Sequence, residues 1–236
     1  AASAVYKRQN KDKSFYWKGE YKNDFNSRVT HLTHLNALEF YKPNLDKHSI
    51  NFDLVMLGNL DPVIQMDIYS QVKNDHNFVI LDTMNYWIEK TEKELFEIIS
   101  KVNLVVINDE ESQMLGKSDL IEECAKNILS CGPDYIIIKK GSQGAELFSK
   151  HQRSTIPALD NIKVVDPTGA GDSFVGGVCG YLASRPSISF KEIHNAMIYG
   201  SVIASFCIEE FGLARLQKIS KEIFDERIKT FASYLL

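Results

Sequence analysis

Residues 164–177, VVDPTGAGDSFVGG, place a carboxylate directly after a glycine-rich turn. Gly169 and Gly171 let the backbone approach a ligand closely, and a helix that begins there leaves its first amide groups without partners. The helix dipole adds positive potential at the same point, so the turn is suited to binding an anion such as phosphate. Asp172 would lie in the first helical turn, where its carboxylate could accept the proton of a hydroxyl group that attacks phosphorus.

The GAGD motif alone also fits a plainer interpretation, in which Asp172 caps the helix and the glycines only form a turn. The neighbouring residues favour the anion site. Val164 and Val165 lead in as a strand, and Gly176 and Gly177 keep the first two helical turns slim for a close approach. Helix capping alone would require none of these glycines.

Two common phosphate-binding motifs do not fit the sequence. Phe174 stands where the dinucleotide fingerprint has its third glycine. Gly116-Lys117-Ser118 resembles the end of a P-loop, but Glu111 occupies the position of the required earlier glycine. We therefore interpret residues 116–118 as an ordinary helix end.

The elements that must position this turn alternate between strands and helices. Apolar runs at 52–58, 78–82, 103–108 and 134–140 are separated by helical patterns at 62–74, 91–102 and 119–132, and Thr91 with Glu94 predicts a capping box. Because the runs are apolar at consecutive positions, both faces of the strands should be buried. The sequence therefore predicts an α/β fold of three layers, a doubly wound and mostly parallel sheet with helices on both faces.

The rest of the chain predicts a hairpin over 145–149 and 153–157 and helices over about 172–184, 190–208 and 217–234. Residues 1–9 have no apolar periodicity and resemble an artefactual, non-native segment, whereas residues 10–236 predict a single domain. Ligands of such sheets bind at the carboxyl ends of the strands. Asp61 and Asp82 lie at these ends and either contact the pocket or simply begin turns.

Composition narrows the possible partners and the compartment. The chain has 27 basic and 31 acidic residues and a net charge of −4, without the basic stripe that nucleic-acid binding requires. No run of 18 apolar residues and no signal peptide is present, so we expect no membrane association. The four cysteines form no CxxC pair, and we expect reduced thiols in a cytoplasmic protein.

Residues 166–174, DPTGAGDSF, resemble the C-terminal signature of the PfkB carbohydrate kinase family, the ribokinase-like kinases. The usual Asp-Thr opening is Asp-Pro here, followed by Thr168, and the GAGD is intact. The resemblance implies that Asp172 is the general base for the substrate hydroxyl. It also implies that the backbone amides of Gly169, Ala170 and Gly171 form an anion hole for the transferred phosphate.

Two further segments strengthen the resemblance. Asn108-Asp109-Glu110-Glu111 fits the family's NxxE motif, which implies a role for Asn108 in phosphate binding and for Glu111 in magnesium binding; a polar helix start is the alternative. Residues 138–145, IKKGSQGA, resemble the strand and turn that line the nucleotide. The nucleotide-binding residues implied by the resemblance, some by position only, are Asn108, Lys140, Gly141, Gly144, Thr168, Asn195 and Gly212.

The resemblance extends from about residue 25 to the C-terminus. The Gly-Gly motif and the early acid that hold the sugar in family members are missing before residue 24, which predicts a truncated member whose N-terminal strands are absent. Residues 14–21 and 26–36 would be remnants of a small β lid, where Arg28 could approach the substrate or lie in solvent. Family members often dimerise through this lid, so a homodimer is possible for the full-length chain.

The resemblance implies an ATP- and Mg²⁺-dependent kinase that transfers the γ-phosphoryl group to a hydroxyl of a sugar or sugar-like molecule. Three alternatives stay open. The acceptor could be a nucleoside, the protein could be a non-catalytic ligand-binding relative, or this chain could be an incomplete protein that binds ATP poorly. Residues 82–87, DTMNYW, resemble a bacterial subgroup of the family and do not identify the substrate.

Overall fold

A computed structural model describes residues 13–21, 28–45, 52–72 and 77–233. The chain divides into two compact units, Ala1–Asn44 and Leu45–Leu236, whereas the sequence predicted one domain over residues 10–236. The difference arises because the first two strands pair with each other and not with the main sheet. The predicted artefactual segment, residues 1–9, lies outside the described residues.

The smaller unit contains an antiparallel pair of strands, β1 (Tyr16–Tyr21) and β2 (Arg28–His34), followed by a short 3-10 helix at Asn36–Leu38. The pairing register shifts between Lys18 and Gly19. Side chains of β1 alternate between exposed and half-buried, as expected for a two-stranded sheet with one covered face. This small antiparallel sheet agrees with the predicted lid remnant.

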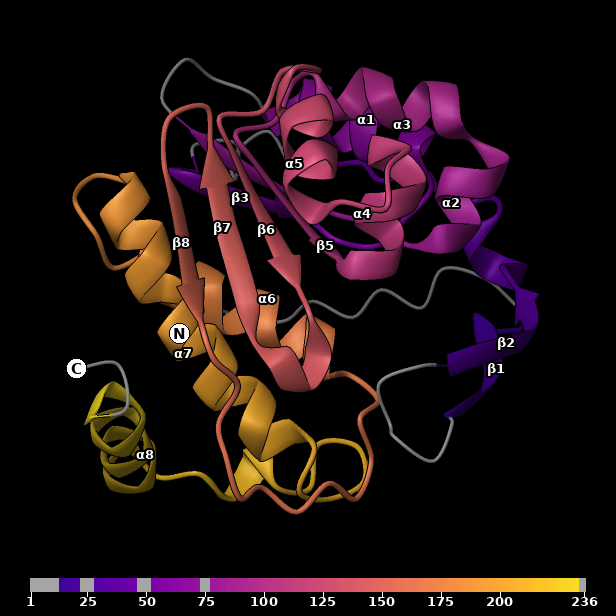
Figure 1. Cartoon of the computed structure of the whole chain (residues 1–236). Helices are drawn as coiled ribbons and strands as arrows, with labels where there is room; N and C mark the ends of the chain where they lie inside the picture. The colour runs from indigo at the N-terminus through magenta and orange to yellow at the C-terminus, as the bar shows by residue number, and fades with distance from the viewer. Residues whose placement is uncertain (1–12, 22–27, 46–51, 73–76, 234–236) are drawn as a thin grey trace. The chain divides into compact units, whose positions relative to one another are not determined.

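The larger unit is built on a six-stranded sheet in the order β3-β4-β5-β6-β7-β8 (Figure 1). Its strands are β3 (Leu54–Leu57), β4 (Phe78–Asp82), β5 (Leu104–Asn108), β6 (Tyr135–Lys139), β7 (Ala145–Ser149) and β8 (Arg153–Ile156). The first four are parallel, and β7 and β8 add an antiparallel hairpin at one edge. The predicted mostly parallel sheet and the predicted hairpin are both confirmed.

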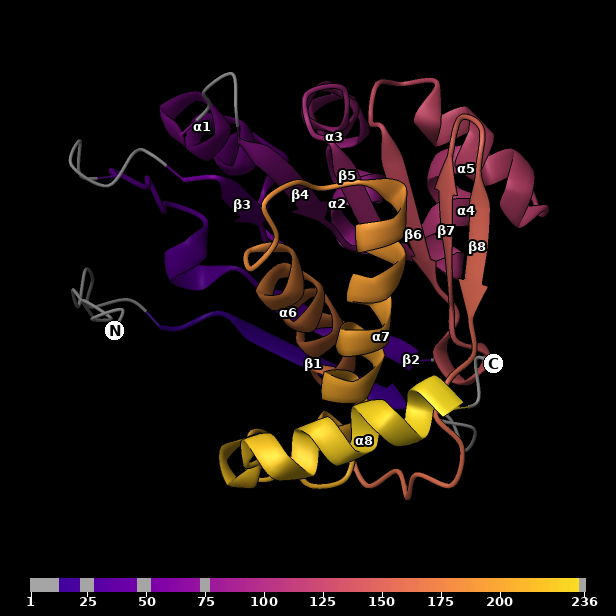
Figure 2. The ribbon, with the colours of Figure 1, turned by 90° about the vertical axis from the view of Figure 1, so that its left-hand side faces the viewer.

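Helices cover both faces of this sheet, as predicted (Figure 2). One face packs against α1 (Pro62–Val72), α2 (Asn85–Lys90), α3 (Glu92–Ile99), α4 (Asp109–Gly116) and α5 (Ile121–Leu129). The other packs against α6 (Ala170–Leu182), α7 (Phe190–Cys207) and α8 (Lys221–Ser233). Successive strand residues alternate between the two cores: Leu81 belongs to the first and Ile80 to the second, and both are fully buried.

The sequence predicted the start of one helix and the end of another, and the structure confirms only the second prediction in full. Thr91 forms no side-chain cap on α3, so the predicted capping box with Glu94 is wrong. Its hydroxyl donates to the carbonyl of Trp87 in the preceding helix, because α2 and α3 share Thr91 at their junction. The end predicted at residues 116–118 is confirmed, since α4 stops at Gly116 and Lys117 adopts the left-handed conformation with φ 54°.

Within the part of the chain that the structure describes, no helix combines the length and apolar character that a membrane span requires. All four cysteines are free thiols, in agreement with the expected reduced state.

Candidate active site

The GAGD turn joins an irregular segment to α6, and Gly169 is the N-cap of this helix. The amide of Thr168 donates to Oδ1 of Asp166 at 3.0 Å, and the amide of Ala170 donates to the carbonyl of Pro167 at 3.1 Å. These two bonds give the turn its tight shape. The next amides of the first helical turn have no carbonyl to bond within α6, which leaves them suited to an anion.

Gly169 and Gly171 are required for different reasons. Gly169 has φ 83°, a left-handed conformation that side chains disfavour. Gly171 is not among the positive-φ residues, so the expected unusual dihedral applies to Gly169 and not to Gly171. A Cβ atom at Gly171 would instead lie 3.3 Å from Nζ of Lys139, so this glycine leaves room for an ammonium group.

Hydrogen bonds to the C-terminal end of α7 hold the turn in place. The amide of Val165 donates to the carbonyl of Ile208 at 2.8 Å, and Sγ of Cys207 donates to the carbonyl of Thr168 at 3.6 Å. Cys207 is buried, and its sulfur would be 3.5 Å from a Cβ atom at Gly169. The backbone of the turn is thus fixed by contacts that are distant in sequence.

Asp172 lies in the first turn of α6, and its side chain is exposed. A carboxylate in the first turn interacts favourably with the helix dipole. Exposure means that a small molecule can reach it without rearrangement of the core. The geometry therefore accommodates a general base next to a turn that is suited to an anion.

Three polar side chains lie above the core on the face that α6 and α7 cover. Ile80, Val106 and Ile137 belong to the core beneath these helices, and because strand side chains alternate, the residues two positions later share their face. Those residues are Asp82 on β4, Asn108 on β5 and Lys139 on β6. Asn108 and Lys139 also pair directly in the β5–β6 register.

Asp82 and Lys139 form an ion pair, with Nζ of Lys139 3.7 Å from Oδ1 of Asp82. The side chains retain 7% and 18% of their exposure, so the pair is largely desolvated. Burial raises the pKa of Asp82, the charge of Asp172 raises it further, and Lys139 opposes both effects. Asp172 follows Gly171, whose Cβ position lies 3.3 Å from Nζ of Lys139, so the exposed acid is next in sequence to the residue beside the ion pair.

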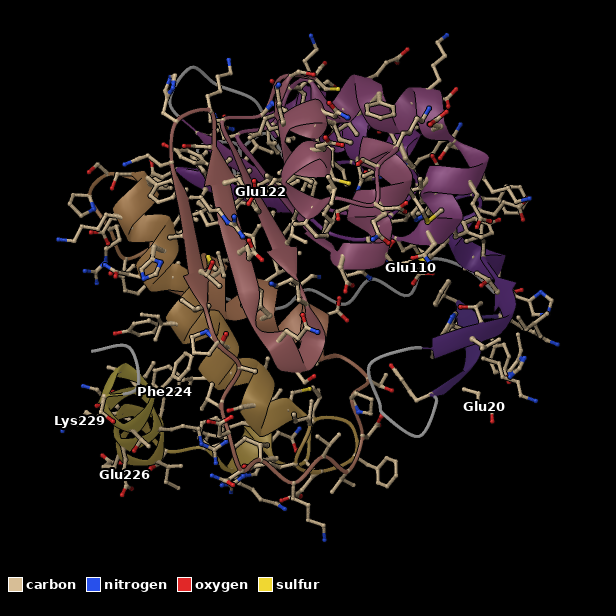
Figure 3. All side chains as sticks on the ribbon, in the orientation of Figure 1. Glu20, Glu110, Glu122, Phe224, Glu226 and Lys229 are labelled. Carbon is tan, nitrogen blue, oxygen red and sulfur yellow. The ribbon has the colours of Figure 1, made fainter. Side chains whose placement is uncertain are left out.

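The NxxE segment forms a complete capping box at the start of α4. Oδ1 of Asn108 accepts from the amide of Glu111 at 2.7 Å, and Oε2 of Glu111 accepts from the amide of Asn108 at 2.9 Å. Glu111 is 3% exposed, whereas its neighbour Glu110 is exposed on α4 (Figure 3). The structure thus shows the capping alternative in full, and the magnesium role of Glu111 stays a prediction.

Lys140 points to a different partner from Lys139. Its ammonium binds Oε1 of the buried Glu146, whose Oε2 accepts from Nη2 of Arg153 at 2.7 Å. Burial alone would raise the pKa of Glu146, but the hydrogen bonds from Lys140 and Arg153 hold it below its ordinary value. Arg153 also forms an ion pair with Glu122 on α5. Lys140, predicted to bind nucleotide, is therefore engaged in a network within the protein.

Two glycines of the predicted nucleotide segment are explained by backbone geometry. Gly141 and Gly144 have φ 53° and 88°, and a Cβ atom at Gly144 would collide with the carbonyl of Ile156. The amide of Lys140 donates to the carbonyl of Gly144 at 2.8 Å. This closed turn follows β6 directly, at the end of the sheet where Lys139 lies.

The remaining predicted residues lie on other segments of the chain. Asn195 bonds the hydroxyl of Tyr181 and lies 12 residues before Cys207 on α7, about 18 Å along the helix at 1.5 Å per residue. Gly212 is exposed, with φ 61°, in the segment after α7. Arg28 begins β2 in the smaller unit, and its side chain lies outside the described residues.

Lys139 and Cys207 were missed as site residues by sequence reasoning. A signal for Lys139 existed, because it follows Ile137 by two positions at the carboxyl end of an apolar strand and must share its face. Cys207 had no such signal, since only the packing of α7 brings its sulfur to Thr168.

The fold and this site together define a three-layer α/β protein with a glycine-rich turn and an acid at the carboxyl end of the sheet. Residues 50–219 match the pfkB family of carbohydrate kinases, and the chain belongs to this family. The resemblance found in residues 166–174 is thereby confirmed.

Individual relatives support the same family and differ in their substrates. The chain is 27% identical over 176 residues to a nucleoside kinase of Methanocaldococcus jannaschii, a match that covers 75% of this chain and 55% of that protein. It is 28% identical over 123 residues to fructokinase-2 of Oryza sativa subsp. japonica, covering 50% of this chain and 36% of that protein. The matches thus span about half the length of these curated relatives, or less.

Solved structures show the same fold. The crystal structure of the Methanocaldococcus jannaschii nucleoside kinase, an archaeal member of the ribokinase family, matches with a TM-score of 0.72 at 21% identity, covering 94% of this chain and 70% of that one. A putative ribokinase II from E. coli in complex with ATP and Mg²⁺ matches with a TM-score of 0.64 at 18% identity, covering 80% and 62%. These similarities establish a ribokinase-like fold.

Proposed function

We propose that this protein is an ATP-dependent kinase that transfers the γ-phosphoryl group to a hydroxyl of a sugar or nucleoside. The observation that carries the proposal is the position of Asp172, exposed in the first turn of α6 directly after the Gly169 to Gly171 turn. A kinase needs this combination of a base for the acceptor hydroxyl and amide groups for the phosphate. Family membership supports the same chemistry.

In the proposed mechanism, the carboxylate of Asp172 accepts the proton of the acceptor hydroxyl as its oxygen attacks phosphorus. Amides of the GAGD turn other than that of Ala170, which bonds to Pro167, hold the transferred phosphate, and the dipole of α6 favours its negative charge. The ion pair of Asp82 and Lys139 lies beside Gly171 of the turn. Asp172 later releases its proton to solvent, to which it is exposed.

The residues present fit Mg²⁺ held mainly through phosphate. Among the described residues, no group of three or more His, Cys, Asp or Glu side chains could hold a metal ion on its own. Mg²⁺ ordinarily binds through one or two carboxylates, several waters and the phosphates of a nucleotide, where it neutralises the developing charge. We assign Glu111 to this site, acting through its buried carboxylate and the capping box that orients Asn108.

The acceptor is the open part of the proposal. The relatives include a nucleoside kinase and a fructokinase, and neither is favoured by the residues of the turn. The test is ADP release by the purified protein with Mg²⁺ and ATP across a panel of hexoses, pentoses and nucleosides. One phosphorylated product supports the proposal. ATP binding without any product would identify a ligand-binding relative, and neither binding nor turnover would contradict the proposal.

We also propose that the protein forms a homodimer through the β1–β2 pair. This small sheet exposes Tyr16, Val29 and Leu32, with 49%, 43% and 41% of their surfaces accessible. Exposed apolar side chains grouped on a two-stranded sheet are typical of an interface. Sedimentation analysis of the protein and of Leu32→Glu would test this assembly, because the added charge should shift a dimer toward monomer.

A further inference from the structure

Asp82 and Lys139 form a largely buried ion pair at the carboxyl end of the sheet. We propose that Lys139 is a catalytic residue that contacts the transferred phosphate, and that Asp82 is a positioning residue that holds Lys139 at the GAGD turn. This inference rests on the proposed kinase function and adds two residues to its chemistry.

The ammonium of Lys139 lies close to the GAGD turn. Nζ of Lys139 lies 3.3 Å from the point where Gly171 would carry a Cβ atom. The amide of Gly171 belongs to the first turn of α6, where amides point toward a bound anion. A phosphate on this turn would therefore lie within reach of the ammonium as well as of the amides.

Lys139 and its partner Asp82 are both largely buried. The side chain of Lys139 is 18% exposed, which is unusual for a lysine because a desolvated ammonium is costly unless it is paired. Asp82 supplies the pair from β4, two strands away in the sheet, and is itself 7% exposed. A purely structural position in this core would be filled at lower cost by an apolar residue, since replacing buried ion pairs by hydrophobic side chains is often neutral or stabilising.

The ammonium of Lys139 can bind a phosphate oxygen in addition to Asp82. An ammonium has three donor hydrogens, and the 3.7 Å separation from Oδ1 of Asp82 is longer than the usual 2.7–2.9 Å of a charge-assisted hydrogen bond. Lys139 can therefore bind a phosphate oxygen while it stays near Asp82. Charge neutralisation at the phosphate is the main contribution that a protein makes to phosphoryl transfer.

The adjacent lysine provides a contrast within the same segment. Lys140 follows β6 by one residue and binds Glu146 of β7, so its ammonium neutralises a buried acid of the hairpin. Lys139 lies on the face that α6 covers, two positions after Ile137. The two neighbouring cations thus have separate partners, and Lys139 is the one beside the turn.

The experiment compares kcat and KM for ATP, with the acceptor that gives the highest turnover, in the wild type, Lys139→Met, Lys139→Arg, Asp82→Asn and the double variant. We expect Lys139→Met to lower kcat about 100-fold, the size of effect seen when one donor to a transition-state oxyanion is removed. KM for ATP should change less than about threefold, because the contact strengthens in the transition state. Lys139→Arg keeps the charge, so its kcat should be about tenfold higher than that of Lys139→Met.

The double variant tests whether Asp82 acts through Lys139. Asp82→Asn should lower kcat about tenfold in the wild type but less than about twofold in Lys139→Met, since a residue that acts only through Lys139 has nothing left to position. Lys139→Met also leaves a buried carboxylate without its cation and lowers stability. The double variant removes both charges, so its loss of kcat reports the missing ammonium even where the single variant folds poorly.

The matched control is Lys101→Met, an exposed lysine just before the amino end of β5, which should leave kcat and KM unchanged. A kcat of Lys139→Met or of the double variant within about threefold of the wild type would overturn the role of Lys139. Equal losses from Asp82→Asn in both backgrounds would overturn the positioning role of Asp82. A wild type without phosphorylated product contradicts the proposed kinase function instead, so the two failures are distinguishable.

Discussion

Gly177 of α6 and Gly200 of α7 bring the two helices into backbone contact. A Cβ atom at Gly177 would lie 2.7 Å from Cα of Gly200, and one at Gly200 would lie 2.7 Å from the carbonyl oxygen of Phe174. The close crossing lets the end of α7 reach back to the GAGD turn, where Cys207 contacts Thr168. The position of the turn over the sheet therefore depends on two glycines in the helical core.

Gly177→Ala should separate the helices and destabilise the protein. The added methyl group meets backbone atoms that cannot rotate away, and overpacking of this kind costs about 1–3 kcal/mol. Gly180→Ala is the matched control on the same helix, because nothing lies within 4 Å of its Cβ position. Chemical denaturation should show a lower free energy of unfolding for Gly177→Ala alone. Equal effects of the two substitutions would contradict the close crossing.

Gly169→Ala should damage the turn through its backbone conformation. The φ of 83° costs an alanine about 1–2 kcal/mol, while the nearest atom, Sγ of Cys207 at 3.5 Å, leaves room for the methyl group. We expect lower stability and, in the proposed kinase, a lower kcat because the amides move. Gly176→Ala, an exposed helical position with open space around it, should instead raise stability by about 0.5–1 kcal/mol.

Asp172→Asn should nearly abolish phosphoryl transfer while it preserves the fold. Loss of a general base lowers kcat by about 10²–10⁴-fold, and asparagine keeps the size of the side chain. ATP binding, measured by calorimetry, should stay within about twofold, because the amides of the turn are unchanged. Asp67→Asn, at an exposed position on α1, serves as the control for loss of one acid. Turnover close to that of the wild type would exclude Asp172 as the base.

Glu111→Gln separates the capping role from the magnesium role. The amide side chain can still accept a hydrogen bond from the amide of Asn108, so helix stability should fall by no more than about 1 kcal/mol. If the carboxylate contributes to magnesium binding, the Mg²⁺ concentration for half-maximal rate should rise severalfold. Glu110→Gln changes an exposed acid one position earlier and controls for charge. An unchanged magnesium titration would leave Glu111 as a capping residue only.

Glu146→Gln should remove a pH-dependent contribution to the free energy of unfolding. The pKa of Glu146 lies below its ordinary value of 4.5, so its ion pairs stabilise the fold above that pH and are lost as the pH falls through the lower folded value. At neutral pH the substitution leaves Lys140 and Arg153 without their buried partner and should cost about 3 kcal/mol. Glu122→Gln, the exposed partner of Arg153, should cost at most about 1 kcal/mol.

In denaturation experiments, the difference between Glu146→Gln and the wild type should shrink as the pH is lowered below 4.5. The direction follows from the lowered pKa, because the folded wild type binds fewer protons than the unfolded chain across that range. A difference that stays constant with pH would show that folding does not lower the pKa of Glu146.

Much of the architecture could be predicted because it depends on local patterns. The consecutive apolar residues of the strands are compatible only with burial on both faces, and the parallel sheet followed from them. Thr91 shows where such reasoning fails: its type and spacing fit a capping box, but α2 ends so close to α3 that its hydroxyl serves the earlier helix. The start of α3 was visible in the local pattern, but α2 and its end at Lys90 were not.

The sequence by itself determined the chemistry of the turn, since GAGD specifies a flexible backbone, a helix start and an acid within four residues. Only the tertiary structure decided which of two adjacent lysines lies beside the turn. Lys139 and Lys140 are adjacent in the chain, and the pleat of β6 directs Lys139 toward Asp82 and Gly171 while Lys140 binds Glu146. That choice depends on strand pairing and on the crossing of α6 over the sheet, contacts between residues far apart in the sequence.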